Sequence, residues 1–180
     1  NGAMKGSKAK VGALYDEVPP DSEYTIVNAA AKLYRAKKCD SIIAVGGGSV
    51  LDTAKGINIL VSLGGSNILD YDGAGTVKSK PTPMIAIPTT SGTGSEVTLV
   101  AVIADHKKKV KMAFTSYFLL PDIALLDSRM TKTLPPFLTA PTAMDALTHA
   151  CEAYYCLAKN PLSDATALAA MIHPEAFPAE

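Results

Sequence analysis

The sequence has little of what would quickly assign it to a class of protein. It contains no tryptophan, and aromatic residues make up 6% of its 180 residues. No apolar run approaches the ~20 residues that a membrane-spanning helix needs, so we expect no membrane partner. The net charge is zero, from 17 basic and 17 acidic residues, which argues against nucleic acid as the main partner.

Cysteine is also scarce. Cys39, Cys151 and Cys156 form neither a disulfide framework nor a Cys-x-x-Cys pair. Because their number is odd and no charged-then-apolar leader opens the chain, we expect a reducing, cytoplasmic setting. The dense basic cluster, residues 107–109 with Lys111, is typical of the solvated tip of a hairpin.

The most informative segment is residues 40–55, where a short apolar run leads through a glycine-rich turn into a helix-forming stretch. The turn consists of Gly46, Gly47, Gly48 and Ser49. Glycines let backbone N–H groups approach an anion closely, and a helix N-terminus favours negative charge, so the segment predicts a phosphate site. It does not fit the dinucleotide fingerprint, because Leu51 occupies the third glycine position, nor the phosphate loop of NTPases. A turn that needs glycine for geometry alone is the alternative.

A second glycine-rich segment, residues 89–96, follows another apolar run at residues 84–87. Its hydroxyl-bearing candidates are Thr89, Thr90, Ser91 and Thr93. Two such turns at the carboxyl ends of neighbouring parallel strands could hold a nucleotide across an open sheet. By itself, the second segment is equally consistent with a polar loop.

Asp145 and His149 are a candidate metal-binding pair. Their i, i+4 spacing places both side chains on one face of a helix. A carboxylate and an imidazole suit Fe(II), Zn or Mn without choosing between them. The alternative is a simple helical ion pair, since a catalytic metal usually needs at least three protein ligands. The other histidines, His106 and His173, do not lie at an obvious ligand spacing.

Apolar periodicity predicts alternating strands and helices up to about residue 135, followed by helices alone. We expect helices at residues 22–38, capped by Asp21 or Ser22, and at 50–63, 139–157 and from 162 onward. We expect buried strands at 41–45, 84–87 and 123–126, a hairpin of 97–104 with 110–114, and a loop at 67–80. This order predicts an α/β fold, with a parallel-sheet nucleotide-binding domain over residues 5–135 and the start of an all-helical domain over 136–180.

Together and in this order, the three segments resemble the iron-containing (group III) alcohol dehydrogenases. The matching stretches are residues 46–55, 88–96 and 144–154, and the resemblance runs from about residue 11 to residue 171. It implies a cofactor site for NAD or NADP that contains Gly46, Gly47, Gly48, Ser49, Asp52, Thr89, Thr90, Ser91 and Thr93. It also implies that Asp145 and His149 are two of the ligands of Fe(II), or alternatively of Zn.

The resemblance implies an oxidoreductase that transfers a hydride between a primary or short-chain alcohol and NAD(P), with the metal polarising the alcohol oxygen. It further suggests a homodimer, and because a fragment should expose a sheet edge and an apolar helix face, we expect further self-association on top of it. The family's first strand and its remaining ligands, histidines of a later helical region, would lie outside this sequence, so we expect a fragment. Two alternatives stay open: a dehydroquinate-synthase-like lyase of the same architecture, and a non-catalytic nucleotide-binding fragment.

Overall fold

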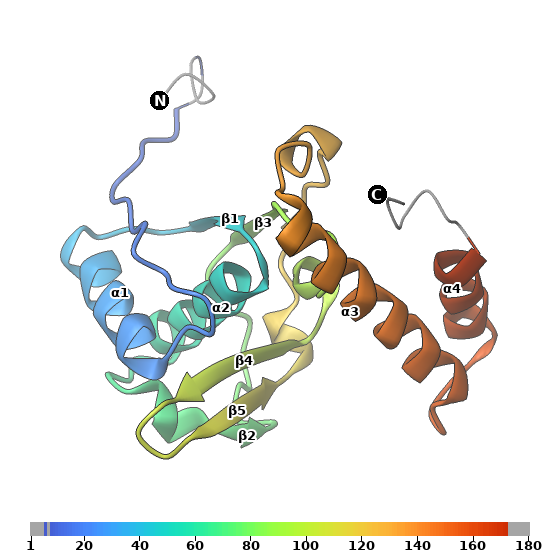
Figure 1. Cartoon of the computed structure of the whole chain (residues 1–180). Helices are drawn as coiled ribbons and strands as arrows, with labels where there is room; N and C mark the ends of the chain where they lie inside the picture. Colours follow the sequence, from blue (N-terminus) through green and yellow to red (C-terminus); the bar gives the residue numbers. More distant parts are fainter. Residues whose placement is uncertain (1–5, 7, 173–180) are drawn as a thin grey trace.

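The computed structural model describes residues 6 and 8–172 (Figure 1). The α-helices are α1 (Tyr24–Ala36), α2 (Gly48–Leu63), α3 (Pro136–Tyr155) and α4 (Pro161–Ile172). The strands are β1 (Ile42–Gly46), β2 (Gly73–Ala74), β3 (Met84–Pro88), β4 (Val100–Asp105), β5 (Val110–Thr115) and β6 (Ile123–Ala124). Short 3₁₀ helices are η1 (Ile68–Tyr71), η2 (Ser95–Val97), η3 (Tyr117–Leu119) and η4 (Ser128–Met130).

The first sheet is parallel, in the order β1-β3-β6, which confirms the predicted α/β fold. Gly46 and Pro88, the last residues of β1 and β3, lie directly beside each other. The two glycine-rich segments therefore leave neighbouring strands at the same edge. The prediction that β1 is a buried strand was wrong in part, because Ile43 and Val45 are 52% and 48% exposed on one face of the sheet.

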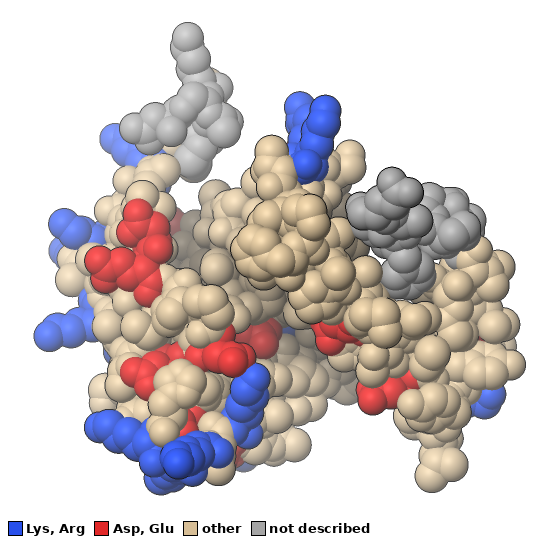
Figure 2. Space-filling model, viewed as in Figure 1, with Lys and Arg blue, Asp and Glu red and all other residues tan. Residues whose placement is uncertain are grey.

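The predicted hairpin is present, but it belongs to a second sheet of order β2-β5-β4, in which β4 and β5 are antiparallel. Its first strand begins at Val100 because the preceding residues form η2. The tip is exposed, and the buried Asp105 carboxylate accepts hydrogen bonds from the N–H groups of Lys107 and Lys108, both at 3.1 Å. Figure 2 shows basic side chains gathered over this hairpin.

Helix α2 lies between the two sheets, so it is buried on opposite sides. Leu51 and Ala54 pack against the parallel sheet. Ile59 and Leu60 pack into the larger core, which α1 and the second sheet complete with residues such as Phe114. The helix ends where predicted, at Gly64, whose φ of 88° is the left-handed conformation that glycine adopts readily. The first residues of α2 are thus held firmly at the edge of the parallel sheet.

Two predictions of local structure were wrong. The N-cap of α1 is Glu23, not Asp21 or Ser22, since the helix begins at Tyr24; the Asp21 carboxylate pairs instead with Lys111 at 2.7 Å. Residues 67–80, expected to be a loop, contain η1 and β2, and η1 starts where the Asn67 side chain accepts a hydrogen bond from Leu69 N at 3.3 Å.

The helical part begins at Pro136, three residues earlier than predicted, since proline is tolerated in the first turn of a helix. Helix α3 projects away from the two sheets, and α4 packs against it (Figure 1). Within residues 6 and 8–172, no helix is both long and apolar enough to cross a membrane. The domain boundary after residue 135 stays a prediction.

Candidate functional site

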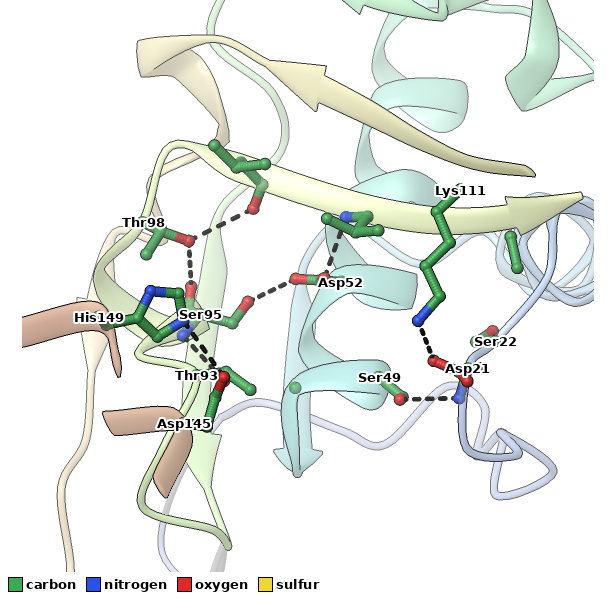
Figure 3. A pocket seen from close by; sticks show the side chains of 14 residues that line it. Asp21, Ser22, Ser49, Asp52, Thr93, Ser95, Thr98, Lys111, Asp145 and His149 are labelled. Atoms are coloured by element: carbon green, nitrogen blue, oxygen red, sulfur yellow. Dashed lines mark hydrogen bonds and ion pairs between the residues drawn. The ribbon is translucent and has the colours of Figure 1, made fainter. Parts of the chain in front are cut away.

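A cavity of about 510 Å³ lies at the meeting point of the first glycine-rich turn, β4 and α3 (Figure 3). Six of the residues predicted from the sequence line it: Gly48, Ser49, Asp52, Thr93, Asp145 and His149. The remaining lining residues are Asp21, Ser22, Ser95, Thr98, Val100, Val102, Ala104 and Lys111. The structure therefore brings parts of all three sequence segments to one place.

The first turn gives the cavity a helix N-terminus. Gly47 is the N-cap of α2, and Gly48 and Ser49 are its first two residues. The first hydrogen bonds of the helix run from Val50 N and Leu51 N to Gly47 O, at 3.0 and 3.1 Å. The N–H groups of Gly48 and Ser49 come before these bonds, where a helix leaves donors without an intrahelical partner. Such donors, together with the helix dipole, favour an anion such as a phosphate.

The two glycine-rich segments pack tightly on each other. Thr89 N donates to Gly46 O at 3.0 Å. A Cβ atom at Gly47 would lie 3.2 Å from Thr90 Cγ2, and one at Gly48 would lie 2.7 Å from Thr93 Cγ2. The glycines therefore have a packing role whether or not a ligand is bound.

Five predicted residues do not line this cavity. Gly46, Gly47, Thr89 and Thr90 form the contact between the two segments, and Ser91 is exposed next to them. Their expected roles in cofactor binding stay predictions.

Gly92, in the second glycine-rich segment, lets helix α3 pack close to the cavity. A Cβ atom at this position would lie 2.7 Å from the carbonyl oxygen of Thr142, so the absence of a side chain lets α3 approach. Asp145 follows Thr142 by less than one helical turn. Figure 3 shows Asp145 and His149 on one side of the group, with Ser49, Asp21 and Lys111 on the other.

The Asp145–His149 pair has donor atoms that suit a divalent transition metal. Asp145 Oδ1 and His149 Nε2 are 3.6 Å apart, and both side chains are partly exposed to the cavity. A carboxylate oxygen and an imidazole nitrogen fit Fe(II) or Zn. In the part of the chain that the structure describes, no group of three or more His, Cys, Asp and Glu side chains could hold a metal. His173 lies outside the described residues.

Asp52 supports the cavity wall from inside α2. Its carboxylate accepts hydrogen bonds from Ser95 Oγ at 2.6 Å and from Val102 N at 3.0 Å. Burial raises the pKa of Asp52, and these two hydrogen bonds and the charge of Lys55 oppose that shift.

Several lining residues were not predicted from the sequence. Lys111 was assigned to the basic tip, yet it lies on β5 and pairs with Asp21 at the cavity. Asp21 N in turn donates to Ser49 Oγ at 3.1 Å, and the pKa of Asp21 is lowered by its hydrogen bond to Lys111 and by the charge of that residue. The buried hydroxyl of Ser22 has no hydrogen-bond partner within the described chain. The position of Lys111 inside a predicted strand could have separated it from the tip lysines.

Family models match most of the chain. The model for "Iron-containing alcohol dehydrogenase" matches residues 2–128, and that for "Fe-containing alcohol dehydrogenase family, C-terminal" matches residues 139–173. Alcohol dehydrogenase 4 of Schizosaccharomyces pombe is 43% identical over 155 residues, covering 86% of this chain and 36% of the relative. The NAD-dependent methanol dehydrogenase of Bacillus methanolicus is 41% identical over 159 residues, covering 88% of this chain and 42% of the relative.

Solved structures of alcohol-related oxidoreductases and reductases also superpose on this chain. A 1,3-propanediol oxidoreductase superposes with a TM-score of 0.83 at 40% identity, covering 87% of this chain and 41% of that one. The sulfoacetaldehyde reductase of Bifidobacterium kashiwanohense, in complex with NAD+, superposes with a TM-score of 0.81 at 33% identity, covering 91% of this chain and 44% of that one. The chain thus spans roughly two fifths of the proteins it matches. These matches and the shared order of its motifs establish that the chain belongs to the iron-containing alcohol dehydrogenase family.

Proposed function

We propose that the protein is a metal-dependent alcohol dehydrogenase that uses NAD or NADP. The observation that carries this proposal is that the N-terminus of α2 and the pair Asp145 and His149 line the same cavity. A dinucleotide has an anionic pyrophosphate, which suits the backbone donors of Gly48 and Ser49. The NAD+ bound to the similar sulfoacetaldehyde reductase supports this choice of cofactor.

In this proposal, Asp145 and His149 hold Fe(II), or alternatively Zn, with ligands beyond the described residues. When bound, the metal polarises the oxygen of the alcohol or aldehyde substrate. The second glycine-rich segment closes the site beside the cofactor, and Asp52 keeps Ser95 in place through a hydrogen bond of 2.6 Å. Names of relatives such as methanol dehydrogenase support a small alcohol as the substrate.

Affinity for NAD+ in a folded variant tests this proposal. A valine at position 48 would place atoms against Thr93 and over the helix N-terminus. We expect Gly48→Val to weaken NAD+ binding, measured by calorimetry, by at least about tenfold. Gly56→Ala is the control for disturbed packing of α2 away from the site, because its Cβ would lie 3.0 Å from Val27 Cγ1 in the core. Equal affinity of wild type and a folded Gly48→Val variant would contradict the assignment.

We also propose a cytoplasmic protein that forms a homodimer or a larger assembly. Exposed apolar side chains support self-association, among them Ile43 and Val45 on the sheet and Phe137 on α3. Sedimentation over a range of concentrations tests this proposal, and a monomer at the highest concentration would contradict it.

A further inference from the structure

Lys55 is a charged residue in the interior of the protein, with 1% of its surface exposed. Lysine is seldom buried so completely, because removing an ammonium group from water is costly. Its Nζ donates to Thr98 O at 2.8 Å, to Val100 O at 2.8 Å and to Thr98 Oγ1 at 3.1 Å. All three acceptors are neutral oxygens; two belong to Thr98, just after η2, and the third to Val100, the first residue of β4.

Asp52 holds the same stretch from the preceding turn of α2. Its carboxylate binds Ser95 Oγ and Val102 N, which lie on either side of the residues that Lys55 binds. Two side chains of α2, Asp52 and Lys55, therefore form hydrogen bonds with one segment. They bind it at four positions: Ser95, Thr98, Val100 and Val102. These four residues line the cavity beside the first turns of α2, where Asp52 binds Ser95 and Val102.

The number of donors on Lys55 matches the number of its acceptors. An ammonium group has three N–H bonds, and a neutral amine has two and a lone pair. A neutral Lys55 could donate to the two carbonyl oxygens and accept from the Thr98 hydroxyl, but these bonds would lack the positive charge that makes hydrogen bonds from an ammonium group about twice as strong. The protonated form of Lys55 therefore holds the segment more strongly than the neutral form does.

That proton is lost as the pH rises through about 8. Burial lowers the pKa of Lys55 to about 8, and the charges of Asp52 and Glu96 only partly oppose this shift. On the side away from the main cavity, a small cavity separates Lys55 from Lys80 and Asp122, which pair with each other at 2.7 Å. The charged groups around Lys55 thus include two carboxylates that favour its protonated form and one ion pair.

We propose that Lys55 is a positioning residue of the nucleotide site: in its protonated form it holds residues 95–102 where they form the cavity wall, so that nucleotide affinity depends on its charge. The affinity part of this proposal rests on the proposed function. Because binding would favour the protonated form, affinity should fall as pH rises through about 8. Lys55 itself does not line the main cavity.

The test compares wild type with Lys55→Met, which keeps a long unbranched side chain but has no donor. Lys32→Met, on the exposed face of α1, is the control. Hydrogen exchange followed by mass spectrometry, corrected for intrinsic rates, reports on residues 95–102 without any ligand. Calorimetry with NAD+ from about pH 7 to about pH 9.5 measures how the affinity for NAD+ changes with pH. It is done well below the melting temperature of each variant.

We expect Lys55→Met to lose protection over residues 95–102 while β1 and β3 keep theirs. At pH 7, it should bind NAD+ at least about tenfold more weakly than wild type, and its affinity should no longer change through pH 8. If residues 95–102 keep their protection from exchange in Lys55→Met, then Lys55 does not hold this segment in place. Lost protection with unchanged affinity and an unchanged pH profile would overturn the positioning role. If wild type does not bind NAD+ at any pH, the proposed function fails, and the exchange data still decide whether Lys55 holds the segment.

Discussion

The two sides of the cavity are built differently. On the α2 side, the turn, the second glycine-rich segment and β4 are joined by buried hydrogen bonds, and α2 itself is packed between two sheets. On the α3 side, Asp145 and His149 are partly exposed, and Ala150 and Ala167 are the buried residues among the described parts of α3 and α4. Within the described residues, the α2 side of the cavity is thus organised by many contacts, whereas the α3 side has few of them.

The largest expected effect compares two phenylalanines. Phe114 is fully buried in the core beside α2, and Phe137 on α3 is 74% exposed. Phe114→Ala should lower the free energy of unfolding by about 3–5 kcal/mol, because it leaves a cavity. Phe137→Ala should change it by less than about 0.5 kcal/mol. Urea denaturation measures both values, and similar losses in the two variants would break the comparison.

The next effect concerns pH and Lys55. Its pKa is about 8 in the folded protein and 10.5 in the unfolded chain, so folding below pH 8 requires burial of the charged form. Between these values the unfolded chain binds more protons, and stability should rise with pH by up to about 3 kcal/mol. Denaturation of wild type and Lys55→Met at both ends of this range measures it. A constant difference between the two proteins would contradict the depressed pKa.

The third effect concerns the α3 side of the cavity and its proposed metal ligands. With only Asp145 and His149 from the described residues, the chain should bind Fe(II) or Zn weakly and show little alcohol oxidation. Asp145→Asn and His149→Ala should each remove the remaining binding, whereas the exposed Glu152→Gln on the same helix should keep it. Elemental analysis and anaerobic calorimetry measure this. Stoichiometric metal in the 180-residue chain would show that a further ligand is present.

The smallest effect is expected at Asp21. Its ion pair with Lys111 is exposed, and such pairs contribute about 0–1 kcal/mol. Asp21→Ala should therefore hardly change the urea midpoint, even though both residues line the cavity. A loss comparable with that of Phe114→Ala would show that this edge of the site is part of the core.

The sequence predicted those parts of the molecule that short-range patterns determine. The glycine-rich turn after an apolar run, the end of α2 at Gly64 and the shared face of Asp145 and His149 all follow from local spacing. The division of the strands into two sheets does not, because it depends on which strands pair across long stretches of chain.

Lys55 and Lys111 show the same limit of sequence-based prediction at the candidate site. A lysine in a sequence is usually solvated, and only the fold shows that Lys55 is buried between α2 and β4. Lys111 was grouped with the tip lysines because they are adjacent in sequence, yet its pairing with Asp21 joins residues 90 positions apart.

The contact between Gly92 and the Thr142 carbonyl also acts as a spacer between the two halves of the cavity. Even one added methyl group would collide with backbone rather than with a side chain that can rotate away. Any relief must therefore come from movement of α3 or of the second glycine-rich segment, and Asp145 lies only three residues beyond the contact. Among the residues of its segment, Gly92 should therefore be the least tolerant of substitution, and a side chain there is the most direct way to change the distance between α3 and the second glycine-rich segment.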